Sequence, residues 1–368
     1  MSLSAELRYL DRTRVLFEGR SYLFFAGTDY HRLSSHPEVV RAFTEAAWAE
    51  GLSCCGSRVT TGNHPLLVQL EDQATRFLGG GSVVLCSSGY LSNTVALETL
   101  RPDYQRFFMA EGVHPSLETP AESLPPDRLH RFPDADPRAL AEALRAHLQP
   151  DERPLLLTEG VLAGDGALPP LAEYWELLRP ARGTLLVDDS HGIGVVGATG
   201  KGSPELAGLP DGCFVQTGTF SKAFGAFGGL VHGPEGFRER VAERSRAFIG
   251  ATPIPPPMAA AGLCAIALLR AQPELITGLP ARMARIRAAV AALGLPASHS
   301  PAPILSVTHG DTGRNLHLRD LLLAAGIYPS YINYPGCPPG GHFRFTFSSA
   351  HTDPEIDRLL AVLAQSWG

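Results

Sequence analysis

The sequence has very few lysines, no cysteine pattern typical of a metal site and no long apolar run. Lys201 and Lys222 are the only lysines among 31 basic residues, so chemistry that needs a side-chain amine must use one of these two. Six cysteines form no C-x-x-C pair and have no histidines at zinc spacing: Cys54, Cys55, Cys86, Cys213, Cys264 and Cys337. We interpret them as reduced packing residues and expect no bound metal.

The composition excludes further classes of protein. A formal net charge of −6 provides no basic face for a nucleic acid, so small molecules are the expected partners. The longest uncharged apolar stretch, residues 258–269, is too short to cross a bilayer. The N-terminus is charged from Glu6 onward and lacks the apolar core of a signal peptide. These features predict a cytoplasmic protein without a membrane span.

Short apolar runs alternate with helical patterns along the first two thirds of the chain. The helical patterns include residues 65–77 and 137–148. The runs are nearly continuous, as in parallel strands that helices cover on both faces. The strands predicted in this way are 82–86, 106–110, 154–158, 184–188, 213–217 and 229–232. The sequence therefore predicts a doubly wound α/β domain, in which ligands collect at the carboxyl ends of the strands.

Beyond about residue 233 the pattern changes. A charged helix over 234–248 and long Ala/Leu helices to about residue 294 precede strand-like runs at 304–308 and 343–347. This order predicts a smaller C-terminal α/β domain. We interpret residues 120–137 as a proline- and acid-rich connection.

The strand over 184–188 delivers Asp188 and His191 just beyond its carboxyl end. A carboxylate in this position pays a desolvation cost unless a cation compensates it, and a protonated pyridine nitrogen would be such a cation. The alternative role for Asp188 is a helix N-cap.

The next strand, over 213–217, leads into a small-residue turn that carries Thr219 and Lys222. Burial among apolar neighbours favours an uncharged amine, which can form a Schiff base, and Thr219 can donate a hydrogen bond to a phosphate. The alternative for Lys222 is a buried ion pair. Lys201 lies in Gly-Lys-Gly-Ser and is predicted to be in a surface turn.

Two further segments complete a binding site. Ser88-Gly89-Tyr90 joins a strand to a helix, whose exposed N–H groups and positive dipole end favour a phosphate ester. His114 follows the strand over 106–110 and can stack on an aromatic ring, although a loop histidine is more often solvated. A lysine, a carboxylate, a phosphate turn and a stacking ring together point to pyridoxal 5′-phosphate (PLP).

The motifs SSGY, H-x-S, EG…GDG, DDSHG and TFSKAFG occur in this order, and the chain resembles the α-oxoamine synthase family of fold-type I PLP-dependent enzymes. The resemblance runs from about Tyr22 to the C-terminus. It implies an aspartate aminotransferase-like fold with an N-terminal segment (1–45), a large PLP-binding domain (46–245) and a small C-terminal domain (246–368).

The resemblance also implies roles for individual residues. Lys222 would be the Schiff-base lysine and general base, Asp188 would hold the pyridinium nitrogen, and His191 would contact the ring hydroxyl. His114 would stack over the ring and hydrogen-bond a substrate carbonyl. The remaining expected cofactor contacts are Ser88, Gly89, Tyr90, Glu159, Thr219 and Thr252, and the expected substrate contacts are Arg344 and Ser348. Because Thr252 matches a position that reaches the neighbouring subunit's phosphate, the resemblance implies a homodimer with shared active sites.

Three positions depart from the family pattern. Thr28 replaces an asparagine near the substrate, Ala163 replaces a serine near the cofactor, and Leu67 replaces the histidine of H-x-x-L-E. The implied reaction is a decarboxylative Claisen condensation between a small amino acid and an acyl thioester of CoA or of a carrier protein. The amino acid and the acyl chain stay open. The alternatives are a fold-type I aminotransferase or carbon–carbon lyase, and a catalytically silent partner subunit, against which the retained Lys222 argues.

Overall fold

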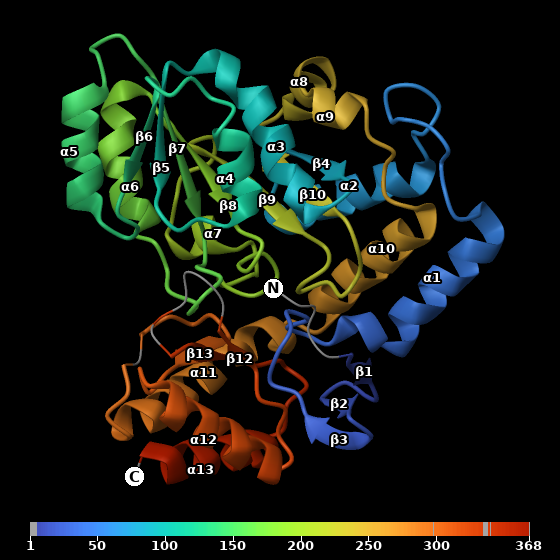
Figure 1. Cartoon of the computed structure of the whole chain (residues 1–368). Helices are drawn as coiled ribbons and strands as arrows, with labels where there is room; N and C mark the ends of the chain where they lie inside the picture. Colours follow the sequence, from blue (N-terminus) through green and yellow to red (C-terminus); the bar gives the residue numbers. More distant parts are fainter. Residues whose placement is uncertain (1–5, 297, 334–337, 339, 368) are drawn as a thin grey trace.

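A seven-stranded sheet forms the centre of the upper part of the molecule in Figure 1. The computed structural model describes residues 6–296, 298–333, 338 and 340–367. Strand order is β4-β10-β9-β8-β7-β5-β6, in which β9, β8, β7, β5 and β6 are parallel and β10 is antiparallel to both of its neighbours. The strand bounds are β4 Ser82–Cys86, β5 Arg106–Ala110, β6 Leu129–Phe132, β7 Pro154–Glu159, β8 Thr184–Asp188, β9 Phe214–Thr219 and β10 Gly229–Gly233. The mostly parallel sheet that the apolar runs predict is confirmed.

Both faces of this sheet are buried. Alternate residues of one strand enter different apolar cores, since Val84 packs in one core and Val83 and Leu85 pack in the other. Helices α3 (Gly89–Leu100), α5 (Pro137–His147), α6 (Leu171–Leu178) and α8 (Phe237–Arg244) contribute to the first core, and α2 (Pro65–Leu78) and α10 (Pro256–Ala271) contribute to the second. Burial on both faces explains why these strands are continuously apolar.

Two predicted segments differ from what the structure contains. The connection over 120–137 includes the strand β6, which pairs in parallel with β5 at the edge of the sheet. The apolar pattern misses this strand because Phe132 is its one fully buried residue. The single helix predicted over 234–248 is two helices, α8 and α9 (Arg246–Ile249), because Ser245 adopts an extended backbone and caps α9 by accepting a hydrogen bond from the Phe248 N–H (3.1 Å).

The C-terminal part contains a small antiparallel sheet with the order β11-β13-β12 and helices on it. Its elements are α11 (Glu274–Ala292), β11 (Ile304–Val307), α12 (Thr312–Ala324), β12 (Tyr331–Ile332), β13 (His342–Thr346) and α13 (Asp353–Trp367). The smaller α/β unit is therefore present. The exact boundaries of the domains stay a prediction.

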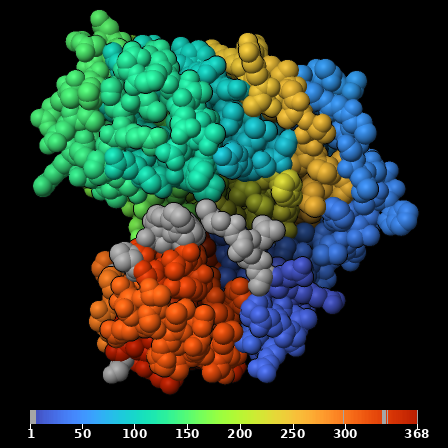
Figure 2. Space-filling model, in the orientation of Figure 1, coloured from blue at the N-terminus to red at the C-terminus, as the bar shows by residue number. Residues whose placement is uncertain are grey.

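The N-terminal segment forms an additional small sheet that the sequence patterns do not predict. It consists of β1 (Arg8–Tyr9), β2 (Arg14–Phe17) and β3 (Arg20–Leu23). Leu23 and Phe25 pack in the C-terminal core, and the Leu23 N–H donates to the Gly326 carbonyl (2.8 Å). In Figure 2 these N-terminal strands, in blue, lie beside the C-terminal part, in orange and red. The chain then continues into α1 (Pro37–Glu50), which packs against α10.

Within the described residues, no single helix is long and apolar enough to cross a membrane. Helices α10 and α11 together reach that length and composition, but they are bent by 68° at their junction.

The described cysteines are free thiols, of which Cys86 and Cys213 are buried, and Cys337 lies outside the described residues. The described residues contain no cluster of side chains suited to a metal ion.

Candidate active site

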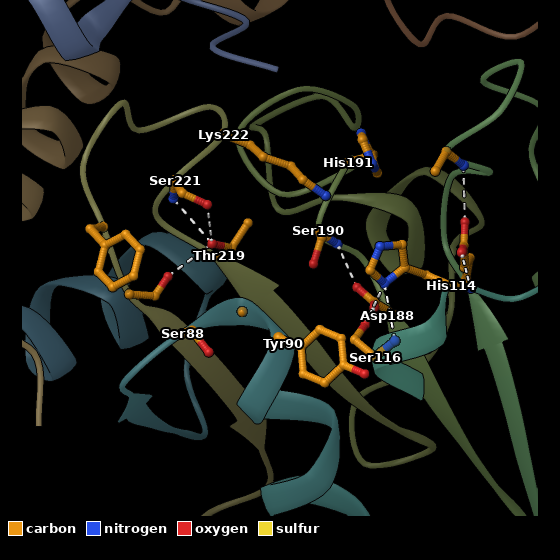
Figure 3. A pocket seen from close by; sticks show the side chains of 15 residues that line it. Ser88, Tyr90, His114, Ser116, Asp188, Ser190, His191, Thr219, Ser221 and Lys222 are labelled. Carbon is orange, nitrogen blue, oxygen red and sulfur yellow. Dashed lines mark hydrogen bonds between the residues drawn. The ribbon is translucent and has the colours of Figure 1, made fainter. Parts of the chain in front are cut away.

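The carboxyl ends of β7, β8 and β9 bring the predicted residues into one pocket (Figure 3). Glu159, Asp188 and Thr219 are the last residues of these three strands. The pocket has a volume of about 230 Å³. Nine of the predicted residues line it: Ser88, Gly89, Tyr90, His114, Glu159, Asp188, His191, Thr219 and Lys222. The strand register places Glu159 opposite Asp188.

Hydrogen-bond donors surround the buried Asp188 carboxylate. Its Oδ2 accepts from Asn93 Nδ2 (2.6 Å) and from the Ser116 hydroxyl (3.3 Å), and its Oδ1 accepts from the Ser190 N–H (3.1 Å). Asn93 is fully buried and its own oxygen accepts from the Thr217 hydroxyl. These bonds orient the carboxylate, which can then hold a protonated ring nitrogen. The sequence analysis assigned no role to Asn93 or Ser116, although Ser116 is the serine of the H-x-S motif and Asn93 lies three residues after Tyr90.

Lys222 extends into the pocket from the turn after β9, with Thr219 toward one end and Asp188 and His114 toward the other (Figure 3). Burial lowers its pKa to about 8, although the negative charge of Asp188 opposes part of this shift. Within the described part of the chain, burial and the charges of neighbouring groups act on this amine, and no hydrogen bond does. Lys222 is therefore a readily deprotonated amine that can react with an aldehyde.

The other end of the pocket is built for an anion. Ser88 caps α3, and its hydroxyl accepts from the Leu91 N–H (3.2 Å). A Cβ on Gly89 would lie 2.7 Å from Thr219 Cβ, so this turn approaches β9 as closely as a glycine allows. Thr219 Oγ1 accepts from the Ser221 N–H (3.1 Å). A small-residue cradle at the first turn of a helix suits a phosphate group.

Glu159 connects two loops around the pocket. Its carboxylate accepts from the backbone N–H of His114 (2.7 Å) and from that of Ala163 (3.0 Å). Burial, with the charge of Asp188 adding to it, raises the Glu159 pKa to about 7. Burial also lowers the pKa of His114, whose Nδ1 accepts from the Ser116 N–H (3.1 Å). A neutral His114 therefore carries its proton on Nε2.

A second cavity of about 820 Å³ adjoins the first and leads toward the C-terminal part of the chain. The two cavities share His114, Glu159, Ala163, His191 and Lys222. Arg344 lines the second cavity from β13, and its Nε donates to the Ala163 carbonyl (2.6 Å). Its terminal nitrogens are left to bind a carboxylate. The space beside Lys222 can thus accommodate a substrate.

Two predicted residues do not line either cavity. Ser348 is buried, and its hydroxyl accepts from Arg32 Nε (3.4 Å) and lies 3.1 Å from His351 Nδ1. Thr252 is exposed on the loop before α10, where its carbonyl accepts from the Ser87 hydroxyl.

The three departures from the family pattern fall in two environments. Thr28 and Ala163 line the second cavity, whereas Leu67 lies in the apolar core.

The donor set fits PLP. The glycine cradle matches a phosphate, Asp188 matches a ring cation, and the Lys222 amine matches an aldehyde. These groups lie around a single pocket, as the cofactor requires.

Comparisons with known proteins agree with this assignment. Residues 24–363 match the family described as aminotransferase class I and II. The 8-amino-7-oxononanoate synthase of Methylococcus capsulatus is 34% identical over 357 residues, which cover 96% of this chain and 91% of that protein. A Desulforudis audaxviator protein that carries the same name provisionally is 36% identical over 361 residues, which cover 98% of this chain and 93% of that protein.

Solved structures confirm the predicted fold class. A lysine-to-alanine variant of serine palmitoyltransferase from S. paucimobilis, solved with a bound PLP–myriocin aldimine, has a TM-score of 0.89 at 23% identity, and the match covers 98% of this chain and 92% of that chain. The 8-amino-7-oxononanoate synthase of Francisella tularensis has a TM-score of 0.78 at 22% identity and covers 94% of this chain and 97% of its own.

Proposed function

The chain belongs to the class I and II aminotransferase family and, within it, to the PLP-dependent α-oxoamine synthases, and we propose that it joins a small amino acid to an acyl thioester with loss of carbon dioxide. One observation carries the proposal. The Lys222 amine, with a pKa of about 8, lies between a pocket that fits PLP and a cavity of about 820 Å³ that reaches Arg344.

PLP, when bound, withdraws electrons from the bonds at the amino acid's α-carbon. The chain's own residues supply the rest. Asp188 would keep a proton on the ring nitrogen, and the free amine of Lys222 would remove the α-proton of the amino acid. Arg344 holds the carboxylate through the nitrogens that its bond to Ala163 leaves available. His114, protonated on Nε2, donates a hydrogen bond to the thioester carbonyl oxygen.

In this reaction the α-carbon of the amino acid attacks the thioester carbonyl and the thiol leaves. The β-keto acid then loses carbon dioxide, and the product is an α-amino ketone.

Among the family activities, we favour 8-amino-7-oxononanoate synthase, which uses alanine and a pimeloyl thioester in biotin synthesis. The names of the relatives that are 34–36% identical support this choice. A sister synthase that uses glycine or serine is the second candidate, since Thr28 and Ala163 change the wall of the cavity that faces the substrate. We also propose a cytoplasmic homodimer with shared active sites, and CoA or a carrier protein as the acyl carrier.

The test is thiol release by the PLP-loaded protein from a grid of acyl-CoAs combined with glycine, alanine and serine. Release that needs both partners identifies a synthase and its substrates. If no pair releases thiol while amino acids still change the cofactor absorbance, an aminotransferase or lyase reaction, or a donor carried on protein, replaces the proposal. A protein without cofactor absorbance would be the silent subunit.

A further inference from the structure

Tyr30 connects the cofactor pocket to the residue expected to bind the substrate carboxylate. Its side chain is 1% exposed, and its hydroxyl lies 2.6 Å from His191 Nδ1. The two rings meet edge to face at 6.1 Å. Arg344 lines the second cavity together with His191, and its charge and N–H groups oppose part of the rise in the Tyr30 pKa. Tyr30 is therefore bound to His191 and interacts with Arg344.

The backbone fixes Tyr30 in this position. Its N–H donates to the Thr28 carbonyl (3.0 Å), and its carbonyl accepts from the Ser349 N–H (2.9 Å). The residue is thus held both by its own turn and by the segment after β13. These bonds fix the backbone from which the side chain extends, and burial confines the ring beside His191.

The protonation state of each partner follows from burial. Burial raises the pKa of Tyr30 to about 12, so the hydroxyl keeps its proton at neutral pH. Burial and the positive charges of Lys222 and Arg344 lower the pKa of His191 well below its usual value. His191 is therefore neutral and has one N–H, on either Nδ1 or Nε2.

Counting donors and acceptors selects one of these tautomers. If Nδ1 carried the proton and donated to Tyr30, the phenolic proton would need another acceptor. Arg344 has only donors, and the hydroxyl has no second acceptor among its hydrogen-bond partners in the described residues. If Tyr30 donates to a bare Nδ1, its oxygen remains free to accept from Arg344, and every group is satisfied.

We propose that Tyr30 is a positioning residue that holds His191 in the tautomer protonated on Nε2 and links that tautomer to Arg344. His191 lines both cavities, and Nε2 has no hydrogen-bond partner among the described residues. The N–H is available to an acceptor oxygen, which under the proposed function is the ring oxygen of PLP. The tautomer itself follows from this chain's residues and does not depend on the proposed function.

Nitrogen NMR of the holoenzyme labelled with ¹⁵N-histidine tests the tautomer directly. The signals of His191 are those that disappear in His191→Gln. We expect Nδ1 of His191 to be unprotonated and hydrogen-bonded and Nε2 to be protonated in the unsubstituted protein. Tyr30→Phe should shift the Nδ1 signal. A protonated Nδ1, or signals that Tyr30→Phe leaves unchanged, would overturn the proposal.

The matched control is Tyr174→Phe. Tyr174 is fully buried, and its hydroxyl forms no hydrogen bond among the described residues, so its loss should leave the His191 signals unchanged.

A binding measurement separates positioning from simple destabilisation. In Tyr30→Phe, the amino acid concentration that half-saturates the change in cofactor absorbance should rise about tenfold, the usual effect of losing one hydrogen bond to a charged group. Tyr174→Phe should match the unsubstituted protein. Equal half-saturation in all three proteins would refute the link to Arg344. If the thiol-release grid fails while His191 carries its proton on Nε2, the proposed function fails and the tautomer stands.

Discussion

Replacing Gly89 with alanine tests the phosphate cradle. Gly89 is the first residue of α3 and has an ordinary helical backbone, so only space opposes a larger residue. The new methyl group would lie 2.7 Å from Thr219 Cβ and 3.0 Å from its Oγ1. The Thr219 side chain cannot easily move away from the new methyl group, because its hydroxyl donates a hydrogen bond to the Gly228 carbonyl (2.9 Å). Relieving such an overlap costs about 1–3 kcal/mol.

This strain falls on the turn that would bind the phosphate, so it should appear as weaker PLP binding. The dissociation constant should rise by about 5- to 150-fold, since each 1.4 kcal/mol corresponds to a factor of ten. The assay is a titration of the cofactor-free protein with PLP, followed by absorbance.

Gly278→Ala is the matched control. Gly278 is an exposed position of α11 where an added Cβ meets no atom within 4 Å. The same substitution should stabilise that helix by about 0.5–1 kcal/mol and leave PLP binding unchanged. Equal PLP affinity in Gly89→Ala and in Gly278→Ala would refute the argument that this turn encloses the phosphate.

The remaining predictions concern the reactive groups. Lys222→Ala should abolish both the cofactor imine absorbance and turnover, and a variant that keeps either would contradict the assigned role. Because the Lys222 pKa is lowered to about 8, the rate at which an amine-reactive reagent modifies Lys222 in the cofactor-free protein should rise as the pH increases through 8. Modification of Lys201 is quantified in the same digest for comparison. A rate for Lys222 that rises steeply only above pH 10 would contradict this prediction. Asn93→Ala removes a donor to Asp188, and kcat should fall about tenfold for the lost hydrogen bond to a charge while the fold is retained by circular dichroism. Arg344→Lys replaces a planar guanidinium, which can form two parallel hydrogen bonds with a carboxylate, by a single ammonium group. KM for the amino acid should therefore rise at least about tenfold, with a smaller change in kcat. An unchanged KM would show that Arg344 does not bind the substrate.

The strands that carry the site could be predicted from the sequence because they are buried on both faces. Continuous apolar runs mark β7 and β8, and the polar residues that end them, Glu159 and Asp188, lie in the pocket. The same logic fails at the sheet edge. Strand β6 has a single fully buried residue and gives no such run, so its pattern predicts a connection instead of a strand.

Side chains that act through contacts with residues far along the chain could not be predicted from the apolar pattern of the strands. Asn93 lies 95 residues from Asp188 in the chain, and Tyr30 lies 161 residues from His191, so no local pattern reports either hydrogen bond. Ser348 illustrates the opposite case. It follows directly on the strand-like run that contains Arg344, but the buried bonds of its hydroxyl to Arg32 and His351 direct it away from both cavities.

The most direct test of the central claim is product analysis with a carboxyl-labelled amino acid. The PLP-loaded protein is given the amino acid with ¹³C in its carboxyl group and the acyl-CoA that supports thiol release, and the products are identified by mass spectrometry. The account predicts equal amounts of ¹³CO₂, free thiol and an α-amino ketone without label. A labelled 2-oxo acid, or labelled carbon dioxide formed without thiol, would contradict it and assign the Lys222 site to a different PLP reaction.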